Sequence, residues 1–201
     1  MIDGWGRKKL EPLLSMLAWR FAKAQISADT VTIAGFLIGL LAAAAIVAGW
    51  FWLAFALVLL SRLADGLDGA VARLTRSSDF GGYLDIVLDF AFYGAVPLAF
   101  VLYDPAANGL AGGVLLFSFY VNGASFLAYA AIAEKRRLVT GIRGDKSFFF
   151  TTGLAEAGET LISFLLACLF PAWFPLLAYL FAVLTLYTAL LRIVLAAQAF
   201  R

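Results

Sequence analysis

The chain has 201 residues, of which 64% are hydrophobic and 14% are charged, and its mean hydropathy is +0.95. These values lie far from those of a soluble globular domain and predict an integral membrane protein. The formal net charge of +2 is too small to indicate nucleic acid binding. Because the chain has no histidine and a single cysteine, Cys168, a disulfide framework and a histidine-based metal or general-base site are excluded.

The first segment is predicted to be an amphipathic helix that lies in the membrane interface, within residues 1–26. Six apolar side chains between residues 8 and 24 recur at helical spacing near one face: Leu10, Leu13, Leu14, Leu17, Ala18 and Phe21. Residues 27–30 then offer N-cap chemistry for the helix that follows.

Six apolar stretches predict an all-α membrane protein with six transmembrane helices in residues 27–201, and the whole chain is expected to form one domain. The predicted spans are residues 31–48, 51 to the charged stretch at 62–68, 81–103, 110–133, 148–170 and 176–199. Turns are expected at 49–50, 104–109 and 171–175.

The basic residues predict the orientation of these spans. All 15 Lys and Arg fall at chain segments that belong to one side of a six-span arrangement, and the three turns on the opposite side carry none. By the positive-inside rule, this side is cytoplasmic, and it includes both termini and the acidic residues described next. We therefore expect a protein of the inner, cytoplasmic membrane with a cytoplasmic-facing site.

Four carboxylates occur within 25 positions beside hydrocarbon, and such a group needs a cation, basic partners or protonation to offset its charge. Asp65 and Asp68 share one helical face, and so do Asp85 and Asp89 on the next predicted span. Hard oxygen ligands without histidine or cysteine suit Mg²⁺, Mn²⁺ or Ca²⁺, and a site that also binds a phosphate suits Mg²⁺ best. The sequence thus predicts an oxygen-ligated divalent metal site.

The residues after Asp68 point to a phosphate-containing ligand. Gly69 and Ala72 have small side chains, which leave room beside the helix, and Arg73 can pair with a phosphate. We expect a metal-held pyrophosphate or phosphodiester here, with one carboxylate left to act as a base.

The pattern Asp65-x-x-Asp68-Gly69-x-x-Ala72-Arg73, then seven residues, then Gly81-x-x-x-Asp85-x-x-x-Asp89 resembles the signature of the CDP-alcohol phosphatidyltransferases at all eight defining positions. The resemblance implies transfer of a phosphatidyl group from CDP-diacylglycerol (CDP-DAG), or of a phospho-headgroup from a CDP-alcohol, to a hydroxyl group, with release of CMP. It also implies a homodimer, as is common in the family.

The resemblance further implies residue roles. Asp65, Asp68, Asp85 and Asp89 would hold two Mg²⁺ or Mn²⁺ ions, and Asp89 would also act as the general base on the acceptor. Six residues would contact the CDP moiety: Thr32, Asp68, Gly69, Ala72, Arg73 and Gly81. The family often has a Pro-Asn pair before the threonine of the first span, whereas this chain has Ala28-Asp29.

For the acceptor alcohol, we expect serine or another small polar alcohol first and a phosphorylated polyol second. The segment 146–154 is similar to phosphatidylserine synthases, which favours serine or another small polar alcohol, although Glu156 and Glu159 depart from that branch. Basic residues would instead suit a phosphorylated polyol such as inositol phosphate or glycerol phosphate. The candidate acceptor contacts are Lys135, Arg143, Lys146, Glu156, Glu159 and Arg192.

Other interpretations compete with these roles. A divalent-cation transporter also places carboxylates in the membrane, although Arg73 would repel the ion. A cluster such as 135–137 is typical of a topology signal, Arg192 can extend to the interface, and Glu156 and Glu159 can pair with nearby basic residues. Three glycines are expected to serve helix packing: Gly112, Gly113 and Gly123.

Overall fold

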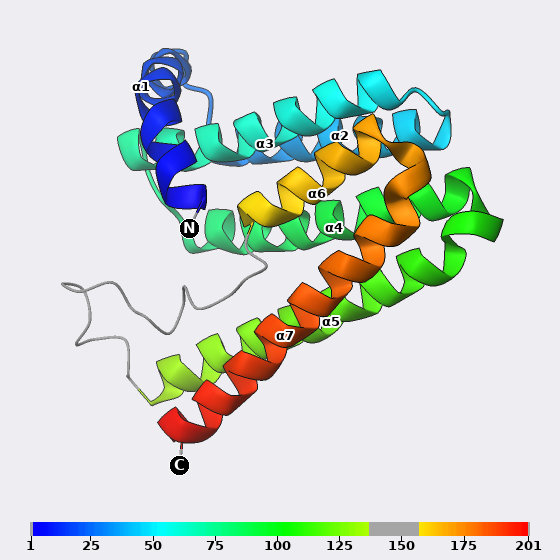
Figure 1. Cartoon of the computed structure of the whole chain (residues 1–201). Helices are drawn as coiled ribbons and strands as arrows, with labels where there is room; N and C mark the ends of the chain where they lie inside the picture. Colours follow the sequence, from blue (N-terminus) through cyan, green and yellow to red (C-terminus); the bar gives the residue numbers. More distant parts are fainter. Residues whose placement is uncertain (1, 137–156, 201) are drawn as a thin grey trace.

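The computed structural model describes residues 2–136 and 157–200, with the backbone alone for residues 2–10 and 13 (Figure 1). Every regular element in these ranges is helical, which confirms the predicted all-α class there. The elements are α1 (Ile2–Lys23), α2 (Ala28–Val47), α3 (Phe51–Leu74), α4 (Asp79–Tyr103), α5 (Pro105–Lys135), α6 (Ala157–Leu169), the short 3₁₀ helix η1 (Pro171–Trp173) and α7 (Phe174–Phe200).

Four helical segments of the described chain are long and apolar enough to cross a membrane: α2, α4, α5, and η1 together with α7. The six predicted spans are therefore confirmed in part. Helix α3 has 24 residues but carries Arg62, Asp65, Asp68 and Arg73. Helix α6 is described over only 13 residues, and the first part of its predicted span, residues 148–156, lies outside the described residues.

Side-chain caps fix where several helices begin. The Ser27 hydroxyl accepts a hydrogen bond from the Thr30 amide at 3.2 Å, as the sequence predicted, and Ser78 accepts one from the Gly81 amide at 2.9 Å. Gly49, with a φ of +76°, turns the chain after α2. The left-handed region is open to glycine without steric cost.

The predicted turn at 104–109 is wrong, because α5 already begins at Pro105. Asp104 accepts a hydrogen bond from the Ala107 amide at 3.0 Å, and a proline is well tolerated in the first helical position because no intrahelical partner is needed there. The Asp-Pro pair therefore starts a helix and does not prolong the turn.

The helices α2, α3 and α4 run side by side, with α6 in front of them. Helices α5 and α7 pack against each other and run obliquely below this group (Figure 1). The buried core between them includes Ile46, Val58, Phe92, Phe100 and Leu115. This core connects all the membrane-length helices in one packed body.

Two of the three glycines expected in helix packing are confirmed in that role. A Cβ atom on Gly112 would clash with Val101, and one on Gly123 would clash with Phe90. Gly113 is different, because a Cβ there would meet nothing within 4 Å. Gly112 and Gly123 thus bring α5 close to α4.

Helix α1 crosses the end of α3 that carries the acidic motif (Figure 1). Its buried Ala18 belongs to a small apolar cluster with Val31, Leu67, Ala70 and Val71, against which Leu14, Leu17 and Phe21 also pack. Trp19 on the same helix is 60% exposed. The expected position of α1 in the membrane interface stays a prediction.

Candidate active site

The carboxylates come from two neighbouring helices that are joined by a short connection. Asp65 and Asp68 lie on the last turns of α3, and Asp85 and Asp89 lie on the first turns of α4. Since the connecting residues 75–78 are few and Ser78 starts α4 at once, the two acidic segments are held at the same end of the helix pair.

Three of these carboxylates converge. One carboxylate oxygen each from Asp65, Asp68 and Asp85 lies within 4.8 Å of the other two, and Asp68 is only 6% exposed. Two oxygens on opposite sides of a Mg²⁺ ion are about 4.2 Å apart, because each lies about 2.1 Å from it. A small rotation of the side chains would therefore bring the three oxygens to a metal ion, and the hard, anionic donor set fits one.

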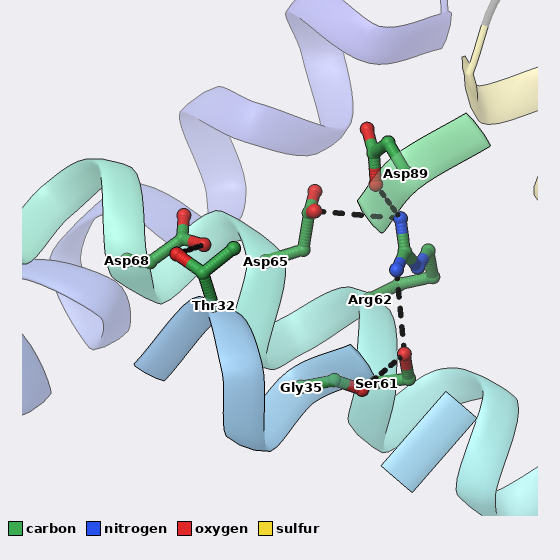
Figure 2. Close-up of polar contacts among 7 residues, drawn as sticks. All are labelled: Thr32, Gly35, Ser61, Arg62, Asp65, Asp68 and Asp89. Carbon is green, nitrogen blue, oxygen red and sulfur yellow. Dashed lines mark hydrogen bonds and ion pairs between the residues drawn. The ribbon is translucent and has the colours of Figure 1, made fainter. Parts of the chain in front are cut away.

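Thr32 of α2 supports this group of three carboxylates. Its hydroxyl donates a hydrogen bond to Oδ2 of Asp68 at 2.6 Å (Figure 2). The resemblance had implied a nucleotide contact for Thr32, and the structure places it against the carboxylate cluster. A hydrogen bond to the ionised form stabilises a buried carboxylate.

The fourth carboxylate, Asp89, is not part of this group of three and pairs with Arg62. Asp89 accepts a hydrogen bond through Oδ1 from Nη1 of Arg62 at 2.6 Å, and the same nitrogen lies 3.4 Å from Oδ1 of Asp65 (Figure 2). Sequence reasoning expected Asp89 among the metal ligands and assigned no site role to Arg62. The available signal was its position three residues before Asp65, on the same helical face.

A cavity of about 10 Å³ lies beside the cluster, which is about the space of one water molecule. A nucleotide would therefore have to bind outside it. The cavity is lined by Thr32, Gly35, Phe36, Ser61, Arg62, Asp65, Asp85, Leu88 and Asp89.

The residues expected to frame a nucleotide lie at the end of α3 and the start of α4. A Cβ on Gly69 would meet within 4 Å only Nη1 of Arg73, at 3.6 Å, so this face of α3 is open. Ala72 is half-buried and Arg73 is exposed one turn further on. Gly81 is crowded instead, since a Cβ there would lie 2.8 Å from Oδ1 of Asp29 on α2.

Three of the six expected acceptor residues belong to the described part of the chain, and they lie on three different helices. Arg143, Lys146 and Glu156 lie outside the described residues, Lys135 ends α5, and Glu159 lies in the first turn of α6. The remaining one, Arg192 on α7, is fixed against α5 as described next.

Arg192 does not simply extend to the interface. Its Nη1 donates to Oδ1 and the backbone oxygen of Asn122, each at 3.0 Å, and to Oγ of Ser125 at 2.7 Å. Its guanidinium also lies 5.6 Å from the ring centroid of Phe126. These contacts tie α7 to α5.

The fold and the site together define a class: a helical membrane protein with a cluster of carboxylates that could hold a metal ion and an open helix face beside it. The sequence model of the CDP-alcohol phosphatidyltransferase family matches residues 25–196 of the chain. Inner membrane protein YnjF of Escherichia coli (strain K12) is 45% identical over 193 residues, which are 96% of this chain and 94% of that protein.

Two further proteins are similar over most of their length. Archaetidylinositol phosphate synthase of Pyrococcus horikoshii is 30% identical over 188 residues, 93% of this chain and 92% of that protein. The crystal structure of Mycobacterium tuberculosis phosphatidylinositol phosphate synthase with CDP-DAG bound shares the fold, with a TM-score of 0.66 and 23% identity over 90% of this chain and 92% of that one. The chain belongs to the CDP-alcohol phosphatidyltransferase family.

Proposed function

We propose that this enzyme transfers a phosphatidyl group from CDP-DAG to the hydroxyl group of an acceptor and releases CMP. The observation that carries the proposal is the convergence of Asp65, Asp68 and Asp85, which are three of the positions at which the sequence resembles the family signature. These three residues would hold Mg²⁺ or Mn²⁺. Such an ion polarises the phosphate and offsets the charge that develops on the leaving CMP.

The nucleotide would bind at the open end of the helix pair. Gly69 and Ala72 leave the donor's phosphates room beside α3, and the exposed Arg73 would pair with one of them. Asp68, Thr32 and Gly81 border the same end of the site. The apolar faces of the spans would accommodate the acyl chains of the donor.

Asp89 would serve as the base. Its Oδ1 is paired with Arg62, which leaves Oδ2 for the proton of the acceptor hydroxyl. In the transfer, that proton moves to Asp89, the acceptor oxygen forms a bond to the donor phosphorus, and the bond from phosphorus to the CMP oxygen breaks. Binding of a second ion would require Asp89 to turn away from Arg62.

For the acceptor, we propose a phosphorylated polyol such as inositol phosphate or glycerol phosphate, ahead of serine. The P. horikoshii protein is named archaetidylinositol phosphate synthase and the M. tuberculosis protein phosphatidylinositol phosphate synthase, which supports this order over the one expected from the sequence. Lys135, Arg192, Arg143 and Lys146 would supply the positive charge that a phosphate needs. The similarity of residues 146–154 to phosphatidylserine synthases keeps serine as the second candidate.

The chain would act as one membrane domain with six spans, in which α3 and α6 join the four helices that qualify by length and composition. The site and both termini would face the cytoplasm, and α1 would lie in the interface. The name of the E. coli relative supports a location in the inner membrane. A homodimer completes the proposal, because the family commonly forms one.

A panel of acceptors tests this assignment. Purified protein with CDP-DAG and Mg²⁺ or Mn²⁺ is supplied with inositol phosphate, glycerol phosphate, serine or unphosphorylated inositol, and the lipid product is identified by mass spectrometry. We expect a product from a phosphorylated polyol. Metal-dependent cation flux into liposomes, with no product from any acceptor, would support the transporter interpretation instead.

A further inference from the structure

Arg62 of α3 lies inside the carboxylate site, where its side chain reaches Asp89 of α4. Its side chain is only 11% exposed, and its Nη1 is 2.6 Å from Asp89 and 3.4 Å from Asp65. Burying a guanidinium group is costly unless anions compensate its charge. The carboxylates of Asp89 and Asp65 offset the cost of burying Arg62, and Arg62 offsets part of theirs.

Contacts from α3 and α4 hold the guanidinium in place, and α2 supports one of them through Ser61. The guanidinium lies 4.0 Å from the ring centroid of Phe92, and its Nη2 is 3.3 Å from Oγ of Ser61. Ser61 in turn donates a hydrogen bond to the backbone oxygen of Gly35 on α2 at 2.8 Å (Figure 2). The charge of Arg62 therefore has a fixed position relative to Asp89.

We propose that Arg62 is a positioning residue that acts as a built-in countercharge of the metal site. It holds Oδ1 of Asp89 beside Asp65 and offsets part of the negative charge of the four carboxylates before a metal ion binds. The inference rests on the proposed metal site but not on phosphatidyl transfer.

The proposal makes Arg62 and the metal competitors. Both are cations, and both are attracted to Asp65, which lies within reach of Arg62 and within the group of three carboxylates. Without Arg62 the cluster would lack this compensation, so the metal-free protein should be less stable while the site should bind a divalent ion more tightly.

The test uses purified full-length Arg62→Gln, with Arg76→Gln as a control because Arg76 is exposed and its loss changes the net charge equally. Thermal unfolding is measured with EDTA and with Mn²⁺, and Mn²⁺ binding is titrated by electron paramagnetic resonance. Arg62→Gln should lower the melting temperature mainly in EDTA and tighten the Kd for Mn²⁺ by about tenfold. Arg76→Gln should change neither.

Two more variants separate countercharge from mere packing. Arg62→Lys keeps the charge and should restore most of the stability in EDTA. The double variant Arg62→Gln, Asp89→Asn removes both partners and should be more stable in EDTA than the sum of the single effects predicts. Equal loss of stability with and without Mn²⁺, additive effects in the cycle, or an unchanged Kd would each overturn the proposal.

None of these measurements contains CDP-DAG, so their outcome is independent of the transfer reaction. If Arg62 behaves as proposed and no lipid product forms with any acceptor, the proposed function fails while the role of Arg62 stands. If a lipid product forms but the Arg62 variants behave otherwise than proposed, the proposed function stands and the role of Arg62 as a countercharge is rejected.

Discussion

Thr32 connects α2 to the carboxylate cluster through a single hydroxyl group. Asp68, which accepts its hydrogen bond at 2.6 Å, is almost fully buried. A buried carboxylate that loses a donor keeps its desolvation cost without compensation. Thr32 should therefore matter for the position and charge of Asp68, a proposed metal ligand, in addition to any contact with the nucleotide.

Replacing Thr32 by Val keeps the shape of the side chain and removes the donor. We expect a loss of about 1–3 kcal/mol in the free energy of unfolding of the metal-free protein, since a buried acceptor is left unpaired. Chemical denaturation in detergent micelles measures it. Thr32→Ser keeps the hydroxyl and should lose much less, and equal losses in the two variants would contradict the role assigned to the hydrogen bond.

At the scale of single residues, the motif spacing predicted most of the carboxylate cluster. Asp65, Asp68 and Asp85 converge as expected, because residues three apart on α3 face the first turns of α4. The partner of Asp89 was not predicted. The pairing with Arg62 crosses from α3 to α4, and it depends on the packing of Phe92 and Ser61, which spacing along one helix does not encode.

At the scale of helices, the close contact between α2 and α4 holds two side chains that contact Arg62. A Cβ on Gly39 of α2 would lie 2.6 Å from Cδ2 of Phe92 and 3.0 Å from Oγ of Ser61. Both of these side chains contact Arg62. A change in the packing of α2 against α4 should therefore alter the position of Arg62 and its hydrogen bond to Asp89.

Gly39→Ala tests this connection. Overpacking should lower the stability by about 1–3 kcal/mol, because Phe92 has to move. Enzymatic activity should fall as well, since Phe92 supports Arg62. Gly94→Ala on α4 is the control, because a Cβ there meets nothing within 4 Å. If both variants retain the stability and the activity of the original protein, α2 does not support the site in this way.

Helix boundaries were predicted correctly where a polar cap was clear, and wrongly where the same residues are typical of both a turn and a helix start. The cap at Ser27 was recognised, whereas the Asp-Pro pair at 104–105 was interpreted as a turn although it starts α5. Gly113 was grouped with Gly112 by composition alone. Only the packing against Val101 distinguishes Gly112 from its neighbour.

At the scale of the whole molecule, the two ends of the helix bundle differ. Exposed tryptophans lie at the turns opposite the acidic motif: Trp50, Trp52 and Trp173. Such residues are enriched at membrane interfaces. Hydropathy predicted six spans, but the charges on α3 keep it from qualifying by composition, and α6 is described in part. The charged residues of the site thus lower the hydropathy of α3, the helix that carries most of them, and hide it as a candidate span.

Labelling of single cysteines tests the proposed orientation. In a Cys168→Ala background, Ser77→Cys lies between α3 and α4, and Ala106→Cys lies at the start of α5, both at exposed positions. A membrane-impermeant thiol reagent added to intact cells should label only Ala106→Cys, and Ser77→Cys should react after permeabilisation. The reverse pattern would place the acidic motif outside the cytoplasm.

The most direct test of the account is release of CMP from CDP-DAG by the purified protein with the acceptor that the panel identifies. We predict release with Mg²⁺ or Mn²⁺, none with EDTA, and a loss of at least about 100-fold in kcat for Asp89→Asn, because the proton acceptor is removed. Asp79→Asn, on the exposed first turn of α4, should keep the original rate. Release that persists in EDTA, or an Asp89→Asn variant as active as Asp79→Asn, would contradict a metal-assisted transfer with Asp89 as its base.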